Sequence, residues 1–329
     1  MTINARRTPV FNLLATAYGI VFNSVFNIVF STVFGVALLT TDVSANEPQA
    51  QAVYSAKGAD TCLQCHDEDY DYPVMTIFYT KHGNRNDPRS PMAQFQCESC
   101  HGPGGEHAKE PYVGQTRAAI INFGHNTATS VNKQNSMCLS CHRDNKRMGW
   151  EAGAHSKQNM LCVDCHKIHT RNDPVLLAKK QADTCYNCHK QQKAQFERTS
   201  VHPVRYGKMQ CSQCHNVHGT LSDRLLVGNT KNETCYRCHM EKRGPFLWAH
   251  APVQEDCGLC HEHHGSNHKP LLKKQAPLLC QQCHSPSGHP TNAYTDFSTQ
   301  STFLLAKSCL NCHFQVHGSN HPSGVKLMR

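Results

Sequence analysis

Residues 185–189 read Cys185-Tyr186-Asn187-Cys188-His189, and this Cys-x-x-Cys-His pattern decides how the whole chain is interpreted. It occurs ten times in 329 residues and uses all twenty cysteines. In chain order, the two cysteines and the histidine of each copy are Cys62, Cys65 and His66; Cys97, Cys100 and His101; Cys138, Cys141 and His142; Cys162, Cys165 and His166; Cys185, Cys188 and His189; Cys211, Cys214 and His215; Cys235, Cys238 and His239; Cys257, Cys260 and His261; Cys280, Cys283 and His284; and Cys309, Cys312 and His313.

This spacing has a chemical reason. Two cysteines one helical turn apart can form thioethers to the two vinyl groups of a haem, and the adjacent histidine can ligate the haem iron. We therefore predict ten covalently bound haem c groups, with the cysteines as attachment points and the ten motif histidines as proximal iron ligands.

Three other interpretations of the cysteines fit less well. Zinc sites use Cys-x-x-Cys pairs, but they need a second pair or a spaced histidine pair and no histidine directly after each second cysteine. A disulfide framework would not place every cysteine in a pair two residues apart. A thioredoxin-like redox pair is plausible once, but not ten times.

The first 45 residues differ from the rest. Arg6 and Arg7 precede an apolar run over about residues 10–39, and the small residues Ser44 and Ala45 suit a cleavage site. We predict a secretory signal peptide over residues 1–45 and a haem-binding domain over residues 46–329. The apolar run is long for a signal peptide, so an uncleaved membrane anchor stays an alternative. Attachment of haem c outside the cytoplasm agrees with export to the periplasm.

The positive charge does not indicate nucleic-acid binding. Arg6, Arg7 and Asp42 fall in the leader, so the remaining chain has a formal charge of +8 instead of +9. Each oxidised haem adds about −1 through its iron and two propionates, so ten haems bring the protein close to neutrality. Many Lys and Arg side chains are then expected to pair with propionates. The mature chain is also poor in large apolar residues, so the porphyrins must supply much of the core.

A repeat of two motifs organises the domain. The third, fifth, seventh and ninth motifs begin 47, 50 and 45 residues apart, and each follows a similar lead-in: Lys133-Gln134, Lys180-Gln181, Lys231-Asn232 or Lys274-Gln275. The repeating unit is Cys-x-x-Cys-His, a spacer, a histidine, and then Cys-x-x-Cys-His followed shortly by another histidine. Five such two-haem units cover the domain.

The repeat sorts the fourteen histidines outside the motifs. It yields one additional histidine per haem, which we predict as the set of distal iron ligands without pairing them to particular motifs: His82, His107, His155, His169, His202, His218, His250, His264, His289 and His317. His321 is a close rival of His317. Four histidines remain outside the motifs and the distal set: His125, His263, His268 and His321. We interpret them as surface or propionate-bonding residues.

The expected fold class is a multihaem cytochrome c. Short α-helices, such as one over residues 191–199, and loops would wrap around an elongated chain of ten haems, with little or no β-structure. Stacking of five similar units would leave contacts mainly between neighbours.

The ligand inventory favours an electron carrier over an enzyme. A multihaem enzyme needs an iron with an exchangeable position, and some mark that haem with lysine in place of the motif histidine; no Cys-x-x-Cys-Lys occurs here. Two imidazoles per iron give closed, low-spin haems whose potentials lack the upward shift from methionine ligation. The alternatives are a multihaem oxidoreductase with one open haem and an electron-storing protein without a defined partner. Carbon monoxide binding separates the first from the carrier.

Residues 60–329 also resemble the periplasmic decahaem c-type cytochromes of the MtrA, MtoA, PioA and DmsE family, most closely its MtrA members. The segments that carry the resemblance include Ser90-Pro91-Met92-Ala93, the motif and its sequel at residues 97–103, Glu241-Lys242-Arg243-Gly244-Pro245 and the ending at residues 317–324.

The resemblance implies a haem wire inserted in an outer-membrane β-barrel porin of the MtrB type. It implies periplasmic or inner-membrane cytochromes as electron donors, and an extracellular multihaem cytochrome or terminal reductase as acceptor. Metal reduction is the implied role. Other family members imply electron flow to an extracellular dimethyl sulfoxide reductase, or inward flow from Fe(II).

Overall fold

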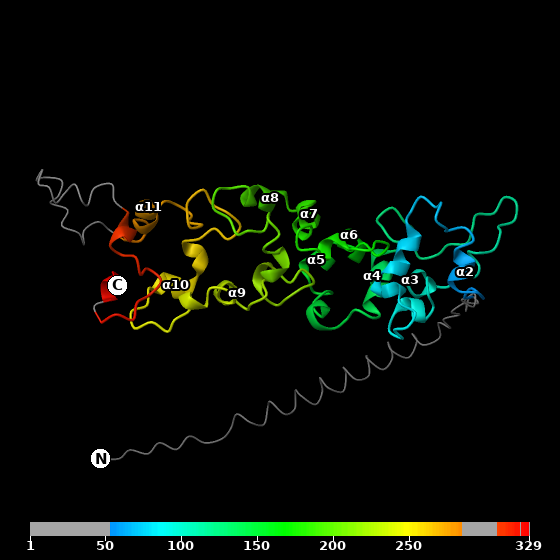
Figure 1. Ribbon diagram of the computed structural model, residues 1–329, viewed down its shortest axis with the longest axis horizontal. Helices are drawn as coiled ribbons and strands as arrows, with labels where there is room; N and C mark the ends of the chain where they lie inside the picture. Colours follow the sequence, from blue (N-terminus) through cyan, green and yellow to red (C-terminus); the bar gives the residue numbers. More distant parts are fainter. Residues whose placement is uncertain (1–52, 285–307, 323, 329) are drawn as a thin grey trace, which may run out of the picture. The chain divides into compact units, whose positions relative to one another are not determined.

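This computed structural model describes residues 53–284, 308–322 and 324–328, and short helices joined by loops make up these residues (Figure 1). These residues belong to one unit, Val53–Arg329. The predicted signal peptide and His289 lie outside the described residues. Within the described segments, no helix has the length and apolarity needed to cross a membrane.

The α-helices are four to nine residues long: α2 (Ala59–Cys62), α3 (Glu98–His101), α4 (Val131–Leu139), α5 (Ala154–Lys157), α6 (Cys162–Cys165), α7 (Gln181–Tyr186), α8 (Lys190–Phe196), α9 (Lys231–Tyr236), α10 (Ala251–Glu255) and α11 (Ala276–Cys280). The 3₁₀ turns are η1 (Val74–Tyr79), η2 (Lys81–Gly83), η3 (Pro91–Ala93), η4 (Asn145–Arg147), η5 (Pro174–Leu176), η6 (Cys211–Gln213), η7 (Asp223–Leu225), η8 (Met240–Lys242), η9 (Cys257–Leu259), η12 (Cys309–Asn311) and η13 (Gly324–Lys326). In the described part of the chain the β-structure consists of isolated bridges, so the expected fold class of short helices and loops is confirmed. The helix expected over residues 191–199 is α8, which ends three residues earlier at Phe196.

The helices follow the two-motif repeat. Odd-numbered motifs have their first cysteine at or near the carboxyl end of a helix, in α2, α4, α7, α9 and α11. Even-numbered motifs begin a new turn at or directly after their first cysteine, in α3, α6, η6, η9 and η12. Polar side chains start several of these elements: Ser130 accepts a hydrogen bond from the Lys133 amide at α4, and Thr230 forms a capping box with Glu233 at α9. Local sequence therefore fixes where each motif turns.

Apolar side chains form only a small core. Among the described residues, eight apolar side chains are buried. Four of them, Ala182, Tyr186, Phe196 and Val204, form one cluster, and the others, such as Leu161, lie outside it. Large apolar side chains are otherwise often exposed, such as Tyr112 and Leu221. A chain of this length would normally bury far more apolar surface, so the fold depends on something besides its own side chains.

Candidate haem sites

All ten motifs adopt the same helical turn. The histidine amide of each motif donates to the carbonyl of that motif's first cysteine at 2.9–3.0 Å. Residues three apart on a helical turn share a face, so each motif presents both thiols on one side. None of the twenty cysteines forms a disulfide.

The motifs form an unbroken row in chain order. Within each predicted unit the thiols of the two first cysteines lie close enough to interact, in the pairs Cys62–Cys97, Cys138–Cys162, Cys185–Cys211, Cys235–Cys257 and Cys280–Cys309. Between units the second cysteines lie close enough to interact electrostatically, in the pairs Cys100–Cys141, Cys165–Cys188, Cys214–Cys238 and Cys260–Cys283. Every motif therefore lies beside the motifs before and after it.

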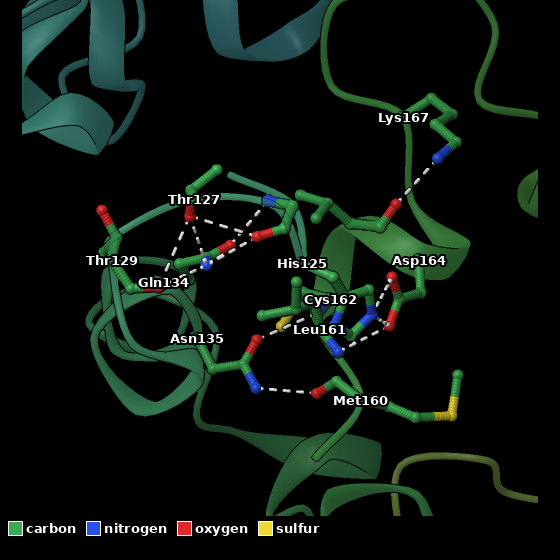
Figure 2. Close-up of polar contacts among 12 residues, drawn as sticks. His125, Thr127, Thr129, Gln134, Asn135, Met160, Leu161, Cys162, Asp164 and Lys167 are labelled. Carbon is green, nitrogen blue, oxygen red and sulfur yellow. Dashed lines mark hydrogen bonds and ion pairs between the residues drawn. The ribbon is translucent and has the colours of Figure 1, made fainter. Parts of the chain in front are cut away.

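Buried amide side chains join the two motifs of a unit. Figure 2 shows Asn135 on α4, whose side chain accepts from the Cys162 amide at 2.9 Å and donates to the Met160 carbonyl at 2.9 Å. Asn232 on α9 accepts from the Cys257 amide at 2.7 Å in the same way, and Gln181 on α7 accepts from the Ser212 amide at 3.0 Å. Three of the four lead-ins that revealed the repeat in the sequence thus lie at, or directly beside, the side chains that dock the fourth, sixth and eighth motifs on their odd-numbered partners.

Nine motif histidines face a histidine from the predicted distal set. The ring centroids are 5.9–6.4 Å apart in the pairs His66–His107, His101–His169, His142–His82, His166–His218, His189–His155, His215–His264, His239–His202, His261–His317 and His284–His250. We call these the histidine pairs. The counterpart predicted for the remaining motif, His289, lies outside the described residues.

The separation in the histidine pairs fits one metal ion between two imidazoles. A metal–nitrogen bond of about 2 Å on each side, with roughly 1.1 Å from each nitrogen to its ring centre, places the centroids about 6 Å apart. The interplanar angles, by contrast, range from 11° to 90°. Free rotation about a metal–nitrogen axis permits this range, whereas ring stacking would select a narrow set of angles.

The pairing crosses the units in a regular way. Away from the ends, an odd-numbered motif faces the histidine that follows the previous odd-numbered motif, as His189 faces His155. An even-numbered motif faces the histidine that follows the next even-numbered motif, as His166 faces His218. Each of the three central units thereby contributes one histidine to each of its two neighbours. At the amino-terminal end the first motif breaks this rule, and His66 faces His107 of its own unit.

Hydrogen bonds orient the imidazoles. Nδ1 of His155 donates to the Val217 carbonyl at 2.8 Å, Nδ1 of His202 to the His263 carbonyl at 2.9 Å, and Nδ1 of His250 to the Val316 carbonyl at 2.9 Å. Several other paired histidines bond in the same way, including His101 and His107 at 2.8 Å. A donor bond at Nδ1 fixes the tautomer and leaves Nε2 unprotonated, with a lone pair that can bind a metal ion. Backbone carbonyls are the usual acceptors, and the sequence gives no signal for them.

Burial keeps many of these imidazoles neutral, which is the form that ligates metal. The pKa of His218 is lowered to about 4, and burial is the largest of several causes. Burial is also the first cause of the lowered pKa values of His82, His101, His142, His169, His261, His264 and His317.

One cavity of about 4640 Å³ connects the sites. Its lining includes the cysteines and histidine of every motif and both members of each histidine pair. His263, predicted from the sequence to be a surface or propionate-bonding residue, also lines it, whereas His125, His268 and His321 do not. The His125 imidazole instead lies 3.0 Å from the Asp164 carboxylate, as Figure 2 shows, and the His321 carbonyl accepts from Trp248.

Two buried polar atoms test what fills the cavity. Among the described residues, Tyr186 Oη and His263 Nε2 are buried without a hydrogen-bond partner, and both residues line the cavity. Buried polar atoms normally have partners. The propionates of a haem would supply acceptors here, since the rest of its periphery is apolar. Burial raises the pKa of Tyr186 to about 12, which keeps its hydroxyl a donor. The cavity thus fits haem in its lining of cysteines and histidines and in the donors it offers to propionates.

The fold and these sites define a multihaem c-type cytochrome, and comparison with known proteins agrees. Residues 97–182 match the family model of the cytochrome c-type protein NrfB-like, residues 202–244 and 250–289 match the doubled CXXCH motif, and residues 37–102 match cytochrome c554 and c-prime. The "Multiheme cytochrome MtrA" of Shewanella baltica (strain OS185) is 47% identical over 289 residues, which cover 85% of this chain and 84% of that protein. The chain therefore belongs to the MtrA family of multihaem cytochromes, carries covalently bound haem c and takes part in electron transport.

Proposed function

We propose that the chain carries ten haem c groups, each with two imidazole ligands, and conducts electrons across the outer membrane inside a β-barrel porin of the MtrB type. Its partners would be periplasmic or inner-membrane cytochromes on one side and an extracellular multihaem cytochrome or terminal reductase on the other. Dissimilatory metal reduction is the role that fits best. The supporting observation is the row of ten motifs together with the nine histidine pairs.

The proposed assignment of ligands follows the histidine pairs. The motif histidines are the proximal ligands, and the predicted set from His82 to His317 supplies the distal ligands. For the tenth haem, His313 is the proximal ligand and His289 the distal ligand. Bound haem supplies the one-electron redox couple. The chain's own residues hold and orient the sites: the cysteines fix the ring edges, and hydrogen bonds at Nδ1 fix the imidazoles.

Two imidazoles per iron leave no position for substrate, which supports a carrier rather than an enzyme. Electron tunnelling weakens steeply with distance, so contact between successive motifs is the property that a conductor needs. The direction of flow depends on the partners, because closed haems in a row pass electrons either way.

Transfer through a sealed membrane tests the function. The holoprotein would be purified with its porin and placed in liposomes that hold an electron-accepting dye, with a reductant outside that cannot cross lipid. We expect rapid reduction of the dye with the complex, and none with the porin alone or with a porin complex of a Cys185→Ala/Cys188→Ala variant, which breaks the row at its middle. Equal reduction by that variant would contradict conduction along the row.

A further inference from the structure

One proximal histidine bonds to a charged acceptor. His166 Nδ1 lies 2.7 Å from Asp173 Oδ2, and the Asp173 side chain is only 12% exposed. The bonded Nδ1 atoms of the other paired histidines in the described segments donate to uncharged oxygens, such as the Arg224 carbonyl for His215. His239 also has a carboxylate nearby, that of Glu241, but the two atoms are 3.6 Å apart and both side chains are more than half exposed.

The loop after the fourth motif explains this difference. The fourth, sixth and eighth motifs are each followed by a loop with a Leu-Leu pair at the same spacing. In the later two loops, residues with positive φ at Arg224 and Leu271 reverse the backbone, and the motif histidine forms a bridge with the second leucine and donates to a backbone carbonyl.

The fourth loop has no positive φ at the equivalent positions. Asp173 and Pro174 begin the turn η5 instead, and Asp173 Oδ1 accepts from the amides of Lys167 and Val175 at 3.3 and 3.4 Å. One carboxylate oxygen is thus held by the loop, and the other faces the His166 imidazole.

A carboxylate acceptor changes what an imidazole does as a ligand. It draws the Nδ1 proton toward itself, so the ring gains negative charge and becomes a more basic donor to the metal. A more basic donor stabilises ferric over ferrous iron and lowers the reduction potential. Burial of Asp173 strengthens the effect because little water screens it.

We infer that Asp173 is a tuning residue that makes the haem of the fourth motif the last in the chain to be reduced. The inference rests on the proposed ligation by His166. Every electron that passes along the row crosses this position, which lies between the third and fifth motifs. Asp173 therefore divides the row into a group of three haems and a group of six, separated by an energetic step.

Redox titration of the holoprotein, followed by low-temperature EPR of the low-spin ferric haems, tests this inference. In the natural protein one haem should reduce after the others, and the variant Cys162→Ala/Cys165→Ala should lack that component. Asp173→Asn removes the charge at constant shape, and Asp173→Ser keeps an oxygen to cap η5. Both should make reduction of that haem at least tenfold more favourable, a shift of about 59 mV for a one-electron couple, while its signal stays low-spin.

Asp223→Asn is the matched control. Asp223 lies in the equivalent loop after the sixth motif, but it is exposed, and His215 there donates to a carbonyl. Its titration should superimpose on that of the natural protein. An unmoved last component in both Asp173 variants, the same shift in Asp223→Asn, or a high-spin haem in both Asp173 variants would overturn the inference. A high-spin fourth haem in the natural protein would instead count against the proposed ligation itself.

Discussion

Removing one distal histidine should affect a haem in a different unit. The structure places His218, which follows the sixth motif, opposite His166 of the fourth motif, 6.2 Å away. His218→Ala should therefore leave the fourth haem with one imidazole, while the sixth haem keeps His215 and the facing His264. If His218 instead ligated the haem of the sixth motif in its own unit, the same substitution would open the sixth haem.

The magnitude follows from the count of motifs. One haem of ten would change from low-spin to high-spin, so the low-spin EPR intensity should fall by one tenth and a carbon monoxide adduct should appear at one per chain. His268→Ala is the control, because His268 is a further histidine in the described part of the chain that does not line the cavity. It should leave both signals unchanged.

Two double variants show which haem has opened. Combining His218→Ala with Cys162→Ala/Cys165→Ala should abolish the high-spin signal, since the haem that lost its ligand is then missing. Combining it with Cys211→Ala/Cys214→Ala should retain the signal. The opposite pattern would refute ligation between units and with it the interpretation of the histidine pairs.

Three further outcomes follow from the structure. Asn232→Ala leaves the Cys257 amide and the Val253 carbonyl without the bonds that Asn232 provides. It should lower the free energy of unfolding by about 1–3 kcal/mol, measured by denaturant unfolding of the holoprotein, whereas Glu255→Ala, at an exposed position, should change it little. Tyr186→Phe should lower the potential of one haem and change its pH dependence if the hydroxyl bonds a propionate. Unchanged titrations would refute that bond, and Tyr236→Phe is the control because the hydroxyl there interacts with Asn232. The holoprotein should show no carbon monoxide adduct from pH 5 to 8. Burial lowers the pKa of His218 to about 4, so above that pH a proton on its imidazole does not compete with the metal. A carbon monoxide adduct that appears between pH 6 and 5 would contradict this.

The sequence predicted the chemistry of the sites better than their connections. Ten copies of one motif determine the cofactor, because each copy carries its own attachment residues. The absence of strands in the described residues also followed from the sequence, since the motifs impose helical turns and the segments between them are short. The family resemblance was confirmed by the comparison with the MtrA protein.

The pairing of histidines could not be predicted. Spacing selects residues such as His155 and His218 as ligands, but the facing motif comes from another unit, and only the path of the loops determines which one. The role of Asp173 was also missed. A signal for it existed, since an acidic residue follows the fourth motif directly before a proline, but its orientation toward His166 depends on backbone angles that differ among otherwise similar loops.

The most direct test of the account is a low-temperature EPR spectrum of the purified holoprotein, with haem counted per chain by mass spectrometry and carbon monoxide difference spectra recorded on the same sample. The account predicts ten haems, all low-spin ferric as isolated, and no carbon monoxide adduct after reduction. A stoichiometric high-spin haem that binds carbon monoxide would contradict it, because one histidine pair would then be open and the chain would have a site for substrate.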